Sequence, residues 1–110
     1  MVNETETAIV IVLTTLDAAA DAEAIANTLV SERLAACINV LPAMVSTYRW
    51  QGAVETAREQ QLVVKTTRDR LESLEQRLAA LHPYEVPEFL VIEVDRASTA
   101  YAAWLRDAVR

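Results

Sequence analysis

The chain is poor in the residues that make tight turns, disulfides and short metal motifs. Its 110 residues include one glycine, one cysteine and one histidine, at Gly52, Cys37 and His82. A single cysteine excludes an internal disulfide and any C-x-x-C metal motif. One glycine leaves few turns that can use a positive φ. We therefore expect helix–strand connections and one hairpin rather than a series of tight β-turns.

Basic residues and long apolar runs are also scarce. Ten Lys and Arg stand against sixteen Asp and Glu, a formal net charge of −6, which argues against a nucleic-acid partner. The apolar run 8–13 is far shorter than the ~20 residues of a membrane span. Residues 1–7 carry acids where a signal peptide would carry bases. We predict a flexible N-terminus at 1–7, a single domain at 8–110, no membrane partner and a reducing cytoplasm.

The hydrophobic pattern that is present predicts alternating strands and helices. β-Branched runs indicate strands at 8–13, at 37–50 with a break at Pro42, at 53–67 and at 89–94. Apolar residues at helical spacing indicate one helix from Asp17, its expected N-cap, to about residue 34, and a second from 68 to 81. Gln51–Gly52 suits a two-residue hairpin turn. Ser98 is a plausible cap for a last helix, with Tyr101, Trp104, Leu105 and Ala108 expected on one face.

A short internal repeat indicates the fold class. The pentapeptide LTTLD at 13–17 matches KTTRD at 65–69, and each copy lies where a strand is expected to give way to a helix. The order βαβ–βαβ with this echo predicts an α+β, ferredoxin-like split βαβ sandwich followed by a C-terminal helix. Its four-stranded antiparallel sheet would carry two helices on one face.

The predicted hairpin is too long for one small domain. An arm of 14 residues would span about 46 Å at ~3.3 Å per residue, and two helices cannot cover that length. An isolated two-stranded ribbon is marginal in water, and its free edges favour pairing with another chain. We therefore expect a closed homo-oligomer in which the ribbons pack on neighbouring sheets.

The loop LHPYEVPE at 81–88 is the first candidate for function. Two prolines stiffen it, and it carries His82, Tyr84 and Glu88; the alternative is a rigid turn between a helix and a strand. Cys37 and His82 follow the two helices, so pseudo-symmetry predicts that they lie at the same end of the molecule. Thiolate and imidazole are good copper or zinc ligands. The alternatives are a buried apolar cysteine and a histidine satisfied by the backbone.

Other polar and aromatic residues are open to more than one interpretation. Lys65 closes a buried strand, so we expect Glu88 or Glu93 to pair with it. Trp50 and Trp104 either line a cleft between subunits or serve in packing. A cysteine hydrolase is not favoured, because Cys37 lacks the position at a helix N-terminus that usually lowers a thiol pKa. We do not expect an enzyme.

Several stretches together resemble the CutA family of divalent-cation tolerance proteins. The resemblance covers nearly the whole chain and is carried by SERLAACINVLP at 31–42, YRWQG at 48–52, VKTT at 64–67, HPYEVPE at 82–88 and YAAWL at 101–105. It implies a cytoplasmic ferredoxin-like homotrimer linked to tolerance of copper and other divalent metals, without established catalysis or an organic cofactor. The shared positions that it places around an inter-subunit cleft are Cys37, Trp50, Lys65, His82, Tyr84, Glu88 and Trp104.

The chain departs from some relatives at two positions. Where those relatives are described with a thiol and a second histidine as copper ligands, this sequence has Thr14 and Leu81. A metal site would then use His82 with Cys37 or Glu88. The alternatives are a small-molecule or signalling-ligand binding module that uses the cleft, and a structural trimer without a ligand.

Overall fold

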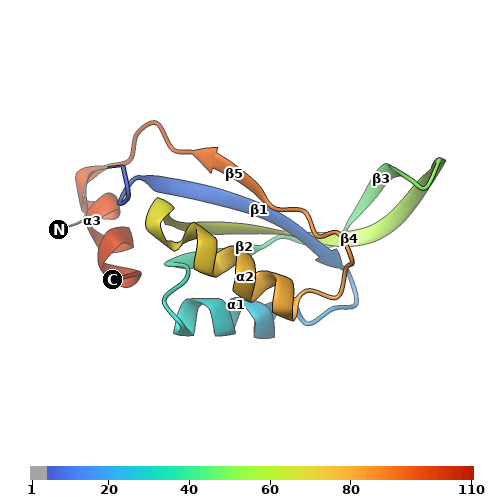
Figure 1. The fold of residues 1–110 in the computed structure, drawn as a ribbon, viewed down its shortest axis with the longest axis horizontal. Coiled ribbons are helices and arrows are strands. Elements are labelled where there is room, and N and C mark those ends of the chain that lie inside the picture. Colours follow the sequence, from blue (N-terminus) through green and yellow to red (C-terminus); the bar gives the residue numbers. More distant parts are fainter. Residues whose placement is uncertain (1–4) are drawn as a thin grey trace.

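The computed structural model describes residues 5–110 and shows an α+β fold with an antiparallel sheet, as predicted. Helices α1 and α2 cover one face of the sheet, and α3 lies across one end (Figure 1). The elements are β1 (Ile9–Asp17), α1 (Ala22–Ser31), β2 (Cys37–Val40), β3 (Met44–Trp50), β4 (Ala53–Thr67), the 3-10 turn η1 (Arg68–Arg70), α2 (Leu71–Leu81), β5 (Leu90–Glu93) and α3 (Thr99–Ala108).

The predicted flexible segment 1–7 lies partly outside the described residues. Residues 5–7 form a turn that is tied to the fold by backbone groups. The Glu6 carbonyl accepts a 2.8 Å hydrogen bond from the Asp69 amide, and the Thr7 carbonyl accepts one of 2.9 Å from the Arg106 side chain. Residues 6 and 7 are therefore hydrogen-bonded to the body of the fold.

The sheet has the order β2-β4-β1-β5, and β3 pairs with the remainder of β4. Along β1 and β4, alternate residues face α1 and α2 and are buried. These residues form the core with Leu29, Leu74 and Leu78 of the helices. The opposite sheet face carries Ile11, Leu13 and Val63, which no helix covers (Figure 1). On β5, Leu90 and Ile92 of this face are 54% and 47% exposed.

The β3–β4 hairpin extends well beyond the two helices, which confirms the predicted ribbon (Figure 1). The chain measures 48 × 25 × 23 Å as a result. The turn lies at Gln51 and Gly52, whose φ angles are 49° and 80°. Two successive positive φ values are what a two-residue hairpin turn with the right-handed strand twist requires.

The start of the first helix differs from the prediction. Asp17 remains in β1, where it pairs with Glu59 of β4. The N-cap is Asp21, whose carboxylate accepts a 3.0 Å hydrogen bond from the Ala24 amide. Asp17 and Asp21 are both suitable N-cap residues. Because β4 is 15 residues long, it pairs with β1 as far as Asp17, and the helix begins only after Asp21. The helix also ends at Ser31, three residues before the expected position.

Helix α3 is capped by Ser98 as predicted, but its buried face is rotated. The Ser98 hydroxyl accepts a 3.2 Å hydrogen bond from the Tyr101 amide. The residues that pack against the end of the sheet are Ala102, Leu105 and Val109. Tyr101 and Trp104 are 41% and 48% exposed, and their ring centroids lie 5.4 Å apart. This aromatic pair therefore belongs to the surface of the chain.

Candidate cation-binding cavity

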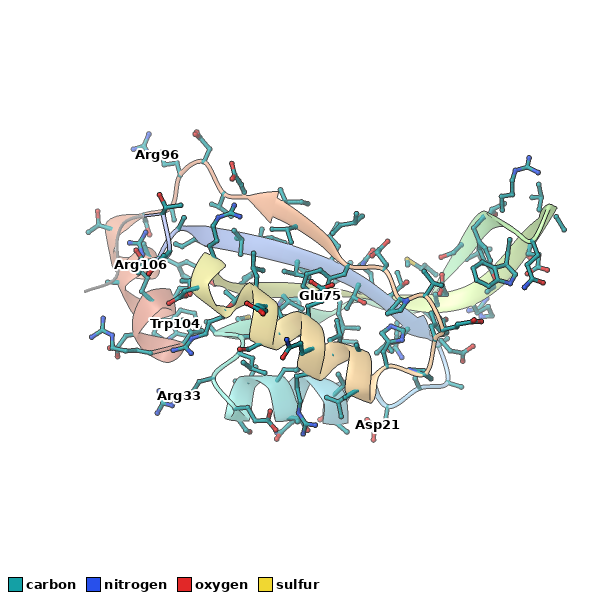
Figure 2. All side chains as sticks on the ribbon, viewed as in Figure 1. Asp21, Arg33, Glu75, Arg96, Trp104 and Arg106 are labelled. Carbon is teal, nitrogen blue, oxygen red and sulfur yellow. The ribbon has the colours of Figure 1, made fainter. Side chains whose placement is uncertain are left out.

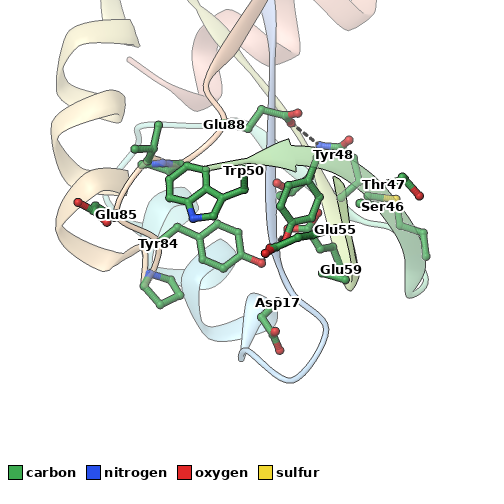
Figure 3. A pocket seen from close by; sticks show the side chains of 17 residues that line it. Asp17, Ser46, Thr47, Tyr48, Trp50, Glu55, Glu59, Tyr84, Glu85 and Glu88 are labelled. Atoms are coloured by element: carbon green, nitrogen blue, oxygen red, sulfur yellow. Dashed lines mark hydrogen bonds between the residues drawn. The ribbon is translucent and has the colours of Figure 1, made fainter. Parts of the chain in front are cut away.

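A cavity of about 880 Å³ lies between the β3–β4 ribbon and the loop that joins α2 to β5. Figure 3 shows the side chains that line it. One wall is formed by residues 83–88 of the loop. The volume falls in the range of roughly 300–1,000 Å³ that is common for small-ligand sites. The loop that the sequence indicated as a functional candidate therefore borders a concave site.

One face of the ribbon forms the other wall. Side chains alternate between the two faces of a strand, so every second residue of β3 and β4 points to the same side. The cavity is lined from β3 by Met44, Ser46, Tyr48 and Trp50, and from β4 by Glu55, Ala57, Glu59 and Gln61; Thr47 also contributes. Tyr48 pairs directly with Glu55 across the hairpin, which sets an aromatic ring beside a carboxylate.

His82 fixes the beginning of the loop. Its side chain is buried, with 7% exposure. The Nδ1 atom accepts a 3.1 Å hydrogen bond from the Tyr84 amide, so the proton is assigned to Nε2, which donates to the Thr15 carbonyl at 2.7 Å. Both ring nitrogens are thus used by the backbone of the same chain. This matches the alternative of a histidine that is satisfied by the backbone.

Tyr84 connects the loop to the ribbon. Its hydroxyl donates a 2.7 Å hydrogen bond to the carboxylate of Glu59, which is 8% exposed. Burial and, next, this hydrogen bond raise the pKa of Tyr84 well above its usual range. Close by, the Gln61 side-chain amide donates a 3.1 Å hydrogen bond to the Glu88 carboxylate and one of 2.7 Å to the Thr14 carbonyl. These bonds hold both walls in place.

The cavity is strongly acidic. Its lining residues include five carboxylates and no lysine, arginine or histidine; the acids are Asp17, Glu55, Glu59, Glu85 and Glu88. Low-dielectric walls of one charge concentrate ions of the opposite charge. In the described part of the chain, however, no group of three or more His, Cys, Asp or Glu side chains converges into a preformed metal site. The cavity therefore suits cations without presenting a closed coordination shell.

The residues that the sequence suggested for one cleft fall into two groups. Trp50, Tyr84 and Glu88 line the cavity together. Cys37 and Lys65 pair across β2 and β4, and Trp104 lies on α3, at the end of the molecule away from the ribbon (Figure 2). Within one chain, the structure therefore does not bring these residues together in one cleft.

The expectation that Cys37 and His82 share one end is wrong. β1 and β4 are antiparallel neighbours, so the helices that follow them run in opposite directions and end at opposite ends of the sheet. Cys37 lies opposite Lys65, whereas Thr15, the partner of His82, lies opposite Gln61. Four residues of strand separate these positions, about 13 Å. A Cys–His catalytic pair or metal pair is therefore not formed within this chain.

The expected partners of Lys65 are also engaged elsewhere. Glu93 forms a 2.7 Å ion pair with Arg68, and Glu88 accepts from Gln61. Lys65 lies half-buried on the sheet face that the helices leave uncovered. No ion pair within residues 5–110 involves it. Its ammonium group is therefore oriented to the same open face as Cys37.

Sequence reasoning missed three acids of the cavity, Asp17, Glu55 and Glu59. Each is an isolated carboxylate without a motif around it. The alternation of side chains between the two faces of the hairpin could have predicted two of them. It puts Glu55 and Glu59 on the same ribbon face as Tyr48 and Trp50. Asp17 was missed because it was expected to cap a helix rather than to line a cavity.

These features define a small α+β protein with an antiparallel sheet and a cavity that suits cations. A sequence model of the family described as "CutA1 divalent ion tolerance protein" matches residues 10–108. The chain belongs to this family, as the resemblance predicted.

Relatives and solved structures agree with this assignment. The divalent-cation tolerance protein CutA of Thermus thermophilus is 44% identical over 97 residues, which cover 88% of this chain and 94% of the relative. A CutA crystal structure from Xylella fastidiosa has a TM-score of 0.88 at 40% identity and covers 93% of this chain and 98% of that one. The structure of the periplasmic divalent cation tolerance protein CutA from Archaeoglobus fulgidus has a TM-score of 0.88 at 27% identity, with coverages of 93% and 99%.

Among residues 5–110, none of the helices has the length and hydrophobicity that a membrane span requires.

Proposed function

We propose that this chain contributes to divalent-cation tolerance by binding the cation in the acid-lined cavity. The observation that carries the proposal is the charge of the lining, which within one chain has five carboxylates and no cationic side chain. Carboxylate, amide and hydroxyl oxygens are suitable ligands for divalent cations, and bound water can complete the shell. The role is one of binding rather than catalysis.

Copper is the cation that the family resemblance favours. Because its preferred ligands differ from carboxylates, we expect its site to be centred outside the acid-lined cavity. Copper ions prefer thiolate and imidazole ligands. Cys37 and His82 lie at opposite ends of one chain, and the His82 ring already bonds Thr15 and Tyr84. We therefore propose that a copper site would form between subunits, with Cys37 of one near His82 and Glu88 of the next, and that copper would replace one of the two backbone partners of the His82 ring.

We also propose that the fold is the ferredoxin-like sandwich and that it assembles as a homotrimer. The strand order and the two helices on one face support the first point. The uncovered apolar sheet face and the projecting ribbon support the second. A head-to-tail contact repeated around a three-fold axis closes into a ring. Such a ring would bring the ribbon end of one subunit to the α3 end of the next, and so join Trp50, Tyr84 and Glu88 to Cys37, Lys65 and Trp104.

The compartment that we propose is the cytoplasm. The single cysteine, which cannot form an internal disulfide, supports it. Cell fractionation with compartment markers tests it, and recovery in a periplasmic fraction would contradict it.

Isothermal titration with Mn²⁺, Zn²⁺ and Cu²⁺ tests the cation role. The double variant Asp17→Asn, Glu55→Gln removes two charges from the cavity without changing side-chain size. Glu75→Gln on α2 removes a charge outside the cavity and serves as the control (Figure 2). We expect affinity for a divalent cation to fall in the double variant and to stay unchanged in the control. Equal affinities in all three proteins would overturn the cavity assignment.

The copper location needs its own variants. We expect Cys37→Ser to weaken Cu²⁺ binding while leaving Mn²⁺ binding unaltered, and His82→Ala to weaken Cu²⁺ binding. Copper affinity that is unchanged in both variants would contradict the proposed site between subunits.

A further inference from the structure

The sheet face that the helices leave uncovered carries opposite charges at its two ends. Lys65 and Glu59 lie on this same face of β4, because they are six positions apart. Lys65 lies at the end near α3, since its carbonyl bonds the amide of Ala36, which packs against α3. Glu59 lies where the ribbon leaves the sheet. The positions between them on β4 and β1 are uncharged; they are Leu13, Thr15, Gln61 and Val63.

Neither charge is neutralised within its own chain. Glu59 is 8% exposed, and the Tyr84 hydroxyl is a neutral donor to its carboxylate. Lys65 is half-buried, and none of the ion pairs in residues 5–110 includes either residue. Six residues of strand, about 20 Å at ~3.3 Å per residue, keep the two apart in one chain. A counter-charge for either residue therefore has to come from outside the chain.

Burial of this face in an assembly increases the need for both counter-charges. A carboxylate or ammonium group taken out of water costs free energy unless an opposite charge and hydrogen bonds compensate it. Among the described strands, Lys65 is the only cationic residue on this face. The head-to-tail ring proposed above brings the ribbon end of one subunit to the α3 end of the next. The negative end of one face therefore meets the positive end of another.

We propose that Lys65 of each subunit enters the acid-lined cavity of the next subunit and forms an ion pair with Glu59 there. The cavity is then completed by a residue of the neighbouring copy, and the pair occurs once at every interface. It also gives the ring its direction, because two like ends brought together would repel each other. The inference rests on the proposed trimer. It uses Glu59 and leaves Asp17 and Glu55 of the lining for a divalent cation.

A double-mutant cycle with neutral substitutes tests the ion pair. Glu59→Gln keeps an acceptor for the Tyr84 hydroxyl, and Lys65→Met keeps the length of the side chain. Each single variant leaves one buried charge unpaired, so we expect the protein concentration at half-assembly to rise at least about tenfold. The double variant leaves no unpaired charge, so we expect it to assemble better than either single variant. Sedimentation velocity over a concentration series measures this.

The control variant removes a carboxylate outside the cavity. Glu75→Gln on α2 should assemble like the wild-type protein (Figure 2), and circular dichroism confirms that each variant is folded. Losses of assembly that add up in the double variant would overturn the ion pair. Single variants that assemble like the wild-type protein would overturn it as well.

Lys65 is the only lysine in the chain, so a zero-length cross-link can identify its partner in the wild-type protein. A carbodiimide joins an amine to a carboxylate in direct contact, with loss of water. Because Lys65 and Glu59 of one chain are about 20 Å apart, a peptide pair linked between them comes from two subunits. We expect mass spectrometry to find this linked pair. Lys65 linked only to other acids would overturn the assignment to Glu59.

Sedimentation of the wild-type protein distinguishes failure of this inference from failure of the proposed trimer. A monomeric wild-type protein would overturn both. A wild-type trimer without coupling between Lys65 and Glu59 would overturn only the ion pair. The cation role is tested separately, because the double variant Asp17→Asn, Glu55→Gln leaves both residues of the pair unchanged.

Discussion

The Tyr84 hydroxyl lies 2.7 Å from the Glu59 carboxylate and donates a hydrogen bond to it. Together with the bond from Gln61 to Glu88, it joins the loop after α2 to strand β4 and holds the two walls of the cavity together. Glu59 pairs in register with both Asp17 and Met44, at the point where the ribbon leaves the sheet. The contact is therefore central to both stability and the site.

Tyr84→Phe removes this bond and leaves Glu59 buried without its donor. We expect the free energy of unfolding to fall by about 1–3 kcal/mol, measured by urea denaturation. Tyr101→Phe is the control, because Tyr101 lies exposed on α3. Equal stability of the two variants would show that the Tyr84–Glu59 bond contributes nothing.

The same bond predicts a dependence on pH. Because the pKa of Tyr84 is raised in the folded protein, the unfolded chain loses this proton first as the pH rises above about 10. The folded state then binds more protons, so stability is fully present below that pH and falls above it. We expect this fall to be smaller in Tyr84→Phe. Parallel stability curves for the two proteins at alkaline pH would contradict the assignment.

Thr14 and Thr66 occupy matching positions of the internal repeat but differ in hydrogen bonding. Both are fully buried. The Thr66 hydroxyl donates a 2.8 Å bond to the Leu34 carbonyl, whereas the Thr14 hydroxyl has no partner among the described residues. We expect Thr14→Val to raise the free energy of unfolding by about 1 kcal/mol and Thr66→Val to lower it by a similar amount. Thermal unfolding of the pair measures this, and shifts of the same sign would contradict it.

Two substitutions in the hairpin turn are expected to change stability in opposite directions. Gly52 has a φ of 80°, and a Cβ added there would meet no atom within 4 Å, so Gly52→Ala introduces backbone strain rather than a clash. We expect it to cost about 1 kcal/mol. Gln51 already has a φ of 49°, so Gln51→Gly relieves strain and is expected to be neutral or stabilising. Denaturation curves compare them, and equal destabilisation by both would refute this account.

The uncovered sheet face predicts the outcome of a charge placed on it. Ile92 is 47% exposed on β5, and a buried unpaired charge is strongly unfavourable in an interface. We expect Ile92→Glu to prevent assembly of the proposed trimer, measured by sedimentation velocity at micromolar concentration. Val30→Glu on α1, at 38% exposure, is the control and should leave assembly intact. A wild-type protein that is monomeric at this concentration would contradict the trimer.

Local chemistry accounts for most of what the sequence could predict. The Gln51–Gly52 turn, the Ser98 cap and the proline-stiffened loop depend on neighbours in the chain, and each was found where expected. Asp17 was misplaced because its strand conformation depends on β4, more than 40 residues away in sequence. Glu59 was missed for the same reason, since its burial depends on a loop that follows it by 25 residues.

The pairing of Cys37 with His82 failed for a topological reason. Their similar positions after two helices suggested one location, but antiparallel β1 and β4 send those positions to opposite ends. A correct prediction needed the direction of each strand, which residue types alone do not provide.

The alternation of the ribbon has a consequence for how its length can vary. One face carries Tyr48, Trp50 and Glu55, and the other carries Val45 and Val54. Inserting or deleting a single residue in β3 would exchange these faces beyond that point, turning aromatic rings outward and valines into the acidic cavity. Changes of two residues would preserve the pattern. Natural variants of this hairpin are therefore expected to differ in length by even steps.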